Sequence, residues 1–302
     1  MAVAVPARIG FLGLGLITGS LARALRQSEW EGQLVAWDRD PLALAEGLQL
    51  NVIDAAVADV PELLGSVDLL VVGTPPMATA ALLADILPCC ERLAVAPVVT
   101  DVASIKGYVC DAVEGSYPFF VPGHPIAGSE DSGVAAGRGD LFRGREVILT
   151  PRPDTSADAQ SMVTAMWRLT GAWVSTMSIA DHDAALAASS HSPHMVAYAL
   201  TAALGSDPLL PMRHGGGALR DMTRIAGSDP VMWRDVAVTN RDALLTALDD
   251  FSASLATLRQ LIVDADAQAL HDFFLACRQI RREHDQILNP LPATGSQEDS
   301  QR

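Results

Sequence analysis

The chain has 302 residues, of which 49% are hydrophobic and 19% charged, a composition typical of a folded globular protein rather than a disordered one. Its formal net charge of −15 argues against nucleic acid or an anionic membrane as a partner, and no apolar run approaches the roughly 20 residues that span a bilayer. We expect no signal peptide, and the four cysteines contain no Cys-x-x-Cys pair, so we expect a reduced, cytoplasmic protein.

The first half of the chain alternates short β-rich runs with helical stretches. Apolar runs at residues 9–12, 34–37, 69–72, 98–100 and 147–149 are typical of parallel strands that are buried on both faces. With helices between them they predict an α/β fold, a Rossmann-type doubly wound sheet over residues 1–152. The sequence Pro-Arg-Pro-Asp at 151–154 breaks this pattern and predicts a linker or the start of a helix.

Helical periodicity dominates the rest of the chain, apart from a strand signal at residues 172–174. Apolar residues at 244, 248, 251, 255, 258 and 262 recur at helical spacing, and a second helix is expected near residues 270–280. We therefore expect an all-helical domain over residues 153–288. We interpret its apolar stripes as the core of a helix bundle, although so regular a stripe can also pack against a second subunit. The polar tail, 289–302, is expected to be disordered.

A glycine-rich loop, GFLGLGLITGS, joins the first predicted strand to a helix. Its glycines let the backbone turn sharply and approach a pyrophosphate, whose charge the helix N-terminus would then meet with free N–H groups. The pattern G-x-G-x-x-G would place a third glycine at position 18, where this chain has Thr18. We expect Gly19 to preserve the close packing of helix on strand by a one-residue offset. The predicted cofactor-binding residues are Gly13, Gly15, Leu16, Ile17, Asp38, Arg39 and Thr74.

Asp38 ends the second predicted strand, 23 residues after Gly15. A carboxylate at this place would bond the ribose 2′-hydroxyl and repel a 2′-phosphate, so the sequence predicts NAD as the cofactor, with NADP less favoured. The neighbouring Arg39 could partly accept a phosphate. The alternative is that Asp38 is only a turn residue ahead of Pro41.

Several polar segments are not explained by helix or strand periodicity. His124 lies in the small-residue loop GHPIAGSE after an apolar strand, and an imidazole can accept a proton near neutral pH. Ser104 follows another strand and is therefore expected at the C-terminal edge of the sheet, where ligands bind. The remaining segments are Asp-His-Asp at 181–183, Ser-His-Ser-Pro-His at 190–194, and residues 215–233, which begin with three glycines.

Together these segments resemble the prephenate and arogenate dehydrogenases of tyrosine biosynthesis, from about residue 8 to residue 280. The loop around His124 and the segment 224–233 are highly specific to that family, whereas the glycine loop alone is not. The resemblance implies a Rossmann domain, then a helical domain that forms a homodimer. It also implies NAD-dependent oxidative decarboxylation of prephenate to 4-hydroxyphenylpyruvate and CO2. Arogenate, which has an amine in place of the side-chain keto group, is the alternative substrate.

The resemblance also implies roles for individual residues. His124 would take or hold the proton of the ring hydroxyl, and Ser104 would orient His124 and the nicotinamide by hydrogen bonds. Arg224 would bind a substrate carboxylate, a task that suits a guanidinium, and His194 would be a second substrate contact. The other residues expected to line the pocket are Ser129, Glu130, Gly217 and Trp233. The acidic residues expected to hold a polar network in place are Asp183 and Asp221.

Some of these residues have simpler interpretations. Trp233 could be plain core, and Asp221 and Arg224 could be an ordinary surface pair. His191 and His194 lack a convincing third metal ligand, so we predict no metal site. We expect His182 and His191 to be structural histidines whose hydrogen bonds are satisfied. Lys106, the single lysine, is assigned no role.

Two other functions compete with the family resemblance. A β-hydroxyacid dehydrogenase would place a general-acid lysine on a helix of the second domain, and this chain has no lysine after Lys106. A non-catalytic NAD-binding interaction module would need neither His124 nor Arg224, and it predicts no turnover.

Overall fold

A computed structural model describes residues 5–113, 115–129, 131–206, 209 and 211–285 of the chain. The chain forms two compact units, Met1–Leu244 and Leu245–Arg302. The predicted disordered tail, 289–302, lies outside the described residues.

The first unit is built on a six-stranded parallel sheet with the strand order β3-β2-β1-β4-β5-β6. Its strands are β1 (Arg8–Leu12), β2 (Gln33–Trp37), β3 (Ala55–Ala56), β4 (Leu69–Val72), β5 (Val98–Asp101) and β6 (Phe120–Val121). The order reverses between β1 and β4, which is the topological switch point where doubly wound sheets bind ligands at the carboxyl ends of their strands. The predicted fold class is confirmed, and the first four predicted strands agree with β1, β2, β4 and β5 to within one residue at each end.

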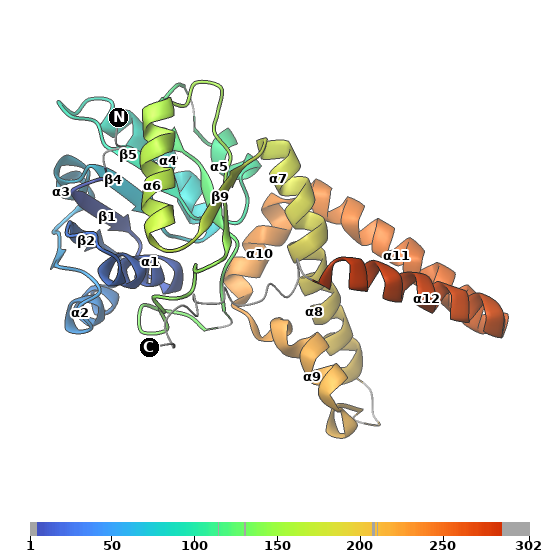
Figure 1. Cartoon of the computed structure of the whole chain (residues 1–302). Coiled ribbons are helices and arrows are strands. Elements are labelled where there is room, and N and C mark those ends of the chain that lie inside the picture. Colours follow the sequence, from blue (N-terminus) through green and yellow to red (C-terminus); the bar gives the residue numbers. More distant parts are fainter. Residues whose placement is uncertain (1–4, 114, 130, 207–208, 210, 286–302) are drawn as a thin grey trace, which may run out of the picture. The chain divides into compact units, whose positions relative to one another are not determined.

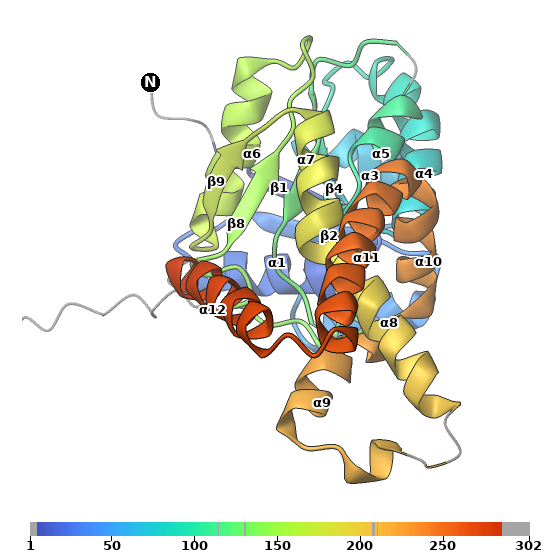
Figure 2. The same cartoon turned by 90° about the vertical axis from the view of Figure 1, so that its right-hand side faces the viewer.

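Helices cover both faces of this sheet, so every central strand is buried. On one face lie α1 (Leu16–Gln27) and α6 (Ala157–Leu169), and on the other lie α3 (Val60–Ser66), α4 (Pro76–Cys90) and α5 (Gly107–Asp111). Figure 2 shows α6 and α4 on opposite sides of the strands. The short helix α2 (Pro41–Gln49) follows β2.

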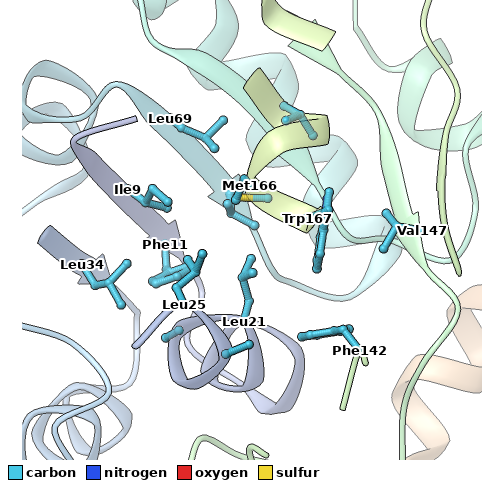
Figure 3. Close-up of a cluster of buried hydrophobic side chains, with 14 of the residues drawn as sticks. Ile9, Phe11, Leu21, Leu25, Leu34, Leu69, Phe142, Val147, Met166 and Trp167 are labelled. Carbon is cyan, nitrogen blue, oxygen red and sulfur yellow. The ribbon is translucent and has the colours of Figure 1, made fainter. Parts of the chain in front are cut away.

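Side chains of β1 alternate between the two cores, as expected for a strand with both faces buried. Ile9 and Phe11 pack against α1 and α6, whereas Leu12 packs with the α3 and α4 side. Figure 3 shows the first of these cores, in which Leu21 of α1 and Trp167 of α6 pack together with the β1 side chains. Burying a large apolar side chain of this kind contributes about 1.5–3 kcal/mol.

A second, three-stranded sheet belongs to the same unit. It consists of β7 (Gly123–Pro125), β8 (Glu146–Leu149) and β9 (Trp173–Thr176), with β7 antiparallel and β9 parallel to β8. Residues of α6 and β8 share one buried core with β1. The core of the first unit therefore continues past residue 152, where the domain boundary was predicted. The proline-rich break there precedes the Ser156 cap of α6 and does not mark a change of core.

Helices at the end of the first unit reach the C-terminal edge of the main sheet. The helix α7 (Ile179–Leu186) continues through a π-helical turn (Ala187–His191) into α8 (Ser192–Gly205), and α9 (Gly217–Thr223) and α10 (Pro230–Thr239) follow. Figure 1 shows α7, α8 and α10 beside the α/β part. Ile105, in the loop after β5, packs in a buried cluster with Trp233 and Val236 of α10. This contact fixes α10 to the edge where the predicted site residues gather.

The second unit contains most of α11 (Arg241–Val263) and all of α12 (Ala267–Glu283). Both helices form as predicted, but their apolar stripes are largely exposed among the described residues and are not the expected bundle core. Phe251, Leu255 and Ile262 are 41%, 52% and 60% exposed, and Phe274 and Ile280 are 54% and 60% exposed. Periodicity shows that a helix has an apolar face, but it does not show what covers that face. Across the described residues, no helix combines the length and the apolar character required to cross a membrane.

Candidate functional site

The glycine loop between β1 and α1 combines a strained turn with open space. Gly13 has a φ of +94°, and a Cβ there would lie 2.8 Å from Cγ2 of Thr74. At Gly15, which caps the helix N-terminus, a Cβ would have no other atom within 4 Å. The loop therefore requires glycine at position 13 for its own fold and leaves the space over position 15 free. This arrangement fits a pyrophosphate held against the first N–H groups of α1, at Leu16 and Ile17.

Thr18, which stands at the third glycine position of the pattern, makes contacts that we did not predict. The Thr18 hydroxyl accepts a hydrogen bond from the Gly15 N–H (2.9 Å) and donates one to the Gly13 carbonyl (3.0 Å). A Cβ at Gly73, after β4, would lie 2.2 Å from Cγ2 of Thr18. The close packing is thus between Thr18 and Gly73. The expected offset to Gly19 is wrong, because Gly19 faces Val134 instead.

Asp38 is both a turn residue and a part of the nucleotide loop. One carboxylate oxygen accepts the Asp40 N–H (2.8 Å) and the other accepts the Leu14 N–H (2.7 Å). The Arg39 side chain next to it is exposed. On the far side of the loop, the Thr74 hydroxyl is hydrogen-bonded to the Thr79 hydroxyl (2.8 Å). The predicted cofactor residues therefore lie in the turns that follow β1, β2 and β4 and in the first turn of α1.

His124 lies in β7 and is 9% exposed. Its Nδ1 is 2.9 Å from Nε2 of His182, and Nδ1 of His182 is 2.7 Å from Oδ1 of Asp183. Burial lowers the pKa of His124 well below its usual value, and the neighbouring His182 and the Lys106 charge lower it further. The His124 imidazole is therefore neutral at physiological pH, and its Nε2 is the nitrogen that His182 does not occupy.

Asp183 is the centre of a polar network that joins α7 to the loop after β5. Its carboxylate accepts the backbone N–H groups of Lys106 (2.9 Å) and Gly107 (2.7 Å) as well as the His182 ring. Burial alone would raise the pKa of Asp183, but these hydrogen bonds outweigh it and hold the pKa below its ordinary value. The carboxylate is ionised and acts only as an acceptor.

Lys106 has a structural role that sequence analysis missed. Its side chain and that of Asp101 are both completely buried and form an ion pair. The Lys106 ammonium also donates to the carbonyl of Gly123 (2.6 Å), the residue immediately before His124. The available signal was its spacing: the chain's single lysine stands five residues after the aspartate that ends β5. A count of lysines alone could not reveal it.

The opposite side of the site comes from α8, α10 and the segment before α10. The His194 ring stacks on Trp233 with the ring centroids 3.6 Å apart, and its Nδ1 donates to the Ser190 carbonyl (3.0 Å). Burial lowers the pKa of His194, the bond to Ser190 partly opposes this, and the Arg224 charge lowers it further. Arg224 thus acts electrostatically on His194, so both residues belong to one positively charged region.

His191 is held beneath this pair, and its hydrogen bonds are not all satisfied. Asn240 Nδ2 lies 2.9 Å from the Asp183 carbonyl and 3.1 Å from Nδ1 of His191. Burial is the main reason that the pKa of His191 falls to about 4. Its Nε2, like Nε1 of Trp233, is buried with no hydrogen-bond partner among the described residues. The expectation of a satisfied histidine is wrong for His191, while His182 touches the predicted base directly.

Three further predicted site residues lie apart from the hydrogen bonds that join His124, His182 and Asp183. Ser104 is half-buried, but within the described residues no hydrogen bond joins it to His124, whose partner is His182. The expected role of Ser104 in orienting His124 and the nicotinamide stays a prediction. Asp221 is exposed and lies 3.6 Å from its neighbour Arg220, outside the Asp183 network. The exposed hydroxyl of Ser129 accepts the Asp131 N–H (3.1 Å).

The last two predicted pocket residues are Gly217 and Glu130. Gly217 is the exposed first residue of α9, and Glu130 lies outside the described residues. Within the described ranges, no three His, Cys, Asp or Glu side chains are grouped so that they could hold a metal ion.

Comparison with known proteins matches the two parts of the chain to two family models. Residues 21–176 match the nucleotide-binding domain of prephenate dehydrogenase, and residues 178–276 match its dimerization domain. These limits agree with the packing of α6 and β9 on the nucleotide-binding core.

Curated relatives and solved structures point the same way. A cyclohexadienyl dehydrogenase of Zymomonas mobilis is 32% identical over 90% of this chain and 94% of that protein. A prephenate dehydrogenase of Bacillus subtilis is 32% identical over 89% and 74%, respectively. A crystal structure of A. aeolicus prephenate dehydrogenase with hydroxyphenyl propionate and NAD+ superposes with a TM-score of 0.84 at 31% identity, covering 94% of this chain and 99% of that one. The structure of Synechocystis arogenate dehydrogenase gives 0.75 at 28% identity, covering 92% and 99%.

Proposed function

Because the chain belongs to the prephenate dehydrogenase family, we propose that it oxidises and decarboxylates prephenate with NAD, giving 4-hydroxyphenylpyruvate, CO2 and NADH. The observation that carries this proposal is the neutral His124, whose Nε2 remains for a substrate at the C-terminal edge of the sheet. When bound, NAD supplies the hydride acceptor. The residues of this chain must bind the substrate, take a proton and exclude competing reactions.

Proton transfer is the task of His124. Hydride leaves the ring carbon that bears the hydroxyl, so the hydroxyl proton must leave as well, and a neutral imidazole can accept it. Loss of CO2 then returns an electron pair to the ring and makes it aromatic. The phenolate oxygen formed in this way takes the proton back from His124. The balance is one hydride to NAD and one CO2 released, with no net proton.

Substrate binding requires positive charge in a chain whose formal net charge is −15. Prephenate carries two carboxylates, and the Arg224 guanidinium can bind one of them by two parallel hydrogen bonds. His194, held by its stacking on Trp233 and its bond to Ser190, is the second contact. These groups belong to the helical segments, whereas His124 belongs to β7, so the substrate would be held from both sides.

Cofactor choice follows from the end of β2. The Asp38 carboxylate is fixed by two backbone N–H groups and remains able to accept the ribose 2′-hydroxyl, whereas its charge repels a 2′-phosphate. We therefore assign NAD rather than NADP. The exposed Arg39 is the residue through which NADP would retain some affinity.

A second copy of the chain is the partner that the helical part would take. The exposed apolar residues of α11 and α12 need a covering surface, and the matched family model is that of a dimerization domain. A homodimer would bury these faces, as the hydrophobic effect requires.

The test is to mix the purified protein with prephenate and NAD and to follow NADH absorbance. His124→Asn should reduce kcat by about 100-fold or more and leave the Kd for NAD and the melting temperature near their wild-type values. An NAD-binding interaction module predicts no turnover by either protein. Parallel assays with arogenate and with NADP decide the substrate and the cofactor, since the proposal requires the higher kcat/KM for prephenate and for NAD.

A further inference from the structure

We propose that His182 is a positioning residue that fixes the tautomer of His124, holding its proton on Nδ1 so that Nε2 presents a lone pair to the substrate. This inference rests on the proposed function, because it explains how His124 is prepared to act as a base. It goes further in naming which nitrogen carries the proton and which residue decides this.

The chain of hydrogen bonds begins at a group that can only accept. The Asp183 carboxylate already receives two backbone N–H groups, from Lys106 and Gly107. These bonds and the His182 contact keep it ionised, and an ionised carboxylate has no proton to donate. Nδ1 of His182, 2.7 Å from Oδ1 of Asp183, must therefore be the donor. The proton of a neutral His182 is thus assigned to Nδ1.

The next bond follows from the first. A neutral imidazole carries one N–H, so Nε2 of a neutral His182 has only a lone pair. This atom lies 2.9 Å from Nδ1 of His124, and the bond between them can form only if His124 donates. Since His124 is neutral too, its Nε2 is then without a proton. Because Asp183 can only accept, the two hydrogen bonds together leave Nε2 of His124, the nitrogen that faces the substrate, without a proton.

The titratable and charged groups near His182 and His124 come from four segments of the fold. Asp183 of α7 is on one side, His124 of β7 on the other, the Lys106 ammonium comes from the loop after β5, and His191 comes from the π-helical turn. A second proton on His182 would reverse the chain, because Nε2–H of His182 would then donate to Nδ1 of His124. The proton of His124 would move to Nε2, and the residue could not act as a base.

Two substitutions of His182 distinguish a role in positioning the His124 proton from a role in only holding α7 against β7. In His182→Gln, the side chain reaches the place of Nε2, so its amide oxygen can accept from Nδ1 of His124 while the bond to Asp183 is lost. In His182→Asn, the shorter side chain reaches the place of Nδ1 and keeps the bond to Asp183 but leaves His124 without an acceptor. The two variants have similar polarity, and each serves as the control for the other.

We expect H182Q to keep kcat within about tenfold of wild type and H182N to lose about 100-fold or more, within the range for acid–base catalysis. The KM for prephenate and the Kd for NAD should change by less than about threefold in both, since neither ligand contacts His182 in this proposal. A purely structural role in tying the β7 side to α7 predicts the opposite order, with H182N the more active variant. That order, or equal loss in both variants, would overturn the inference.

A measurement on the wild-type protein makes the inference independent of how the variants fold. Nitrogen NMR of protein labelled at histidine reports which ring nitrogen is protonated, and the His124 signals are identified by their loss in His124→Asn. We expect Nδ1 of His124 to be protonated and Nε2 to be bare at neutral pH. The reverse assignment would refute the tautomer lock even if prephenate is turned over. Absence of turnover with the expected NMR result would refute the proposed function alone.

Discussion

The buried ion pair between Lys106 and Asp101 gives the sharpest test of how this site is held together. Both side chains are 0% exposed, so neither charge is stabilised by water. Lys106→Met keeps most of the side-chain volume but removes the ammonium. The Asp101 carboxylate would then keep only the Ala103 N–H at 2.8 Å and a long contact to the Gly123 N–H at 3.4 Å. The Gly123 carbonyl would lose its donor.

The expected cost is large because one unpaired charge remains in the interior. Breaking a buried ion pair from one side costs about 3–5 kcal/mol. In a unit of this size, 1 kcal/mol shifts the melting temperature by about 2–4 °C. Lys106→Met should therefore melt roughly 6–20 °C below wild type, measured by circular dichroism and checked by urea unfolding.

The control removes both charges. In the double variant Lys106→Met, Asp101→Asn, the amide oxygen can still accept the Ala103 N–H, and no buried charge is left. At least half of the lost stability should return, since replacing both members of a buried pair by neutral groups is far less costly than removing one. The reasoning is refuted if Lys106→Met unfolds within about 1 kcal/mol of wild type, or if the double variant is no more stable than the single one.

Three further predictions concern the nucleotide loop, pH and assembly. Gly15→Ala should leave the melting temperature unchanged and weaken NAD binding more than about tenfold. Gly13→Ala should lower the melting temperature, because the φ of Gly13 is +94°. Equal melting temperatures of the two variants in calorimetry would contradict this prediction. Burial lowers the pKa of His124 in the folded state, and it lowers that of His191 to about 4. Below about pH 6.5 the unfolded state therefore binds more protons than the folded state. The free energy of unfolding should then fall as pH drops from 6.5 toward 4, by up to about 1.4 kcal/mol per pH unit for each histidine, and His191→Gln should remove one of the two contributions in urea titrations. Phe251→Glu, on an exposed apolar stripe, should convert a dimer to a monomer in sedimentation, and an unchanged mass would exclude that face from the interface.

The fold was predictable to the extent that it depends on local patterns. Continuous apolar runs located the strands of the main sheet because parallel strands are buried on both faces. The extent of a domain, in contrast, is not set by local patterns alone. The break at residues 151–154 is a real local signal, but whether α6 joins the first core depends on contacts with distant residues such as Phe11. The apolar face of α11 was likewise visible, but not what covers it.

The candidate site shows the same division between local and distant information. The glycine loop and the loop around His124 were found because each is a contiguous motif with its own chemistry. The partner of His124 was not found, because His182 is 58 positions away in the sequence. Family resemblance pointed instead to Ser104 as the residue that orients His124. Spacing along a chain indicates which residues share a helix face or a loop, but not which side chains meet across two segments of the fold.

The loop after β5 explains why distant segments can be aligned so closely at this site. Within seven residues it holds the Asp101–Lys106 pair, donates from Lys106 to the carbonyl before His124, and presents two backbone N–H groups to Asp183. Gly107 makes the last contact possible, since a Cβ there would lie 2.8 Å from Oδ2 of Asp183. Most of these ties end on backbone atoms, which lose little freedom once the sheet is formed, so the loop can position the base without relying on long flexible side chains. The buried lysine is therefore part of the means by which His124 and the His182–Asp183 pair keep a fixed geometry.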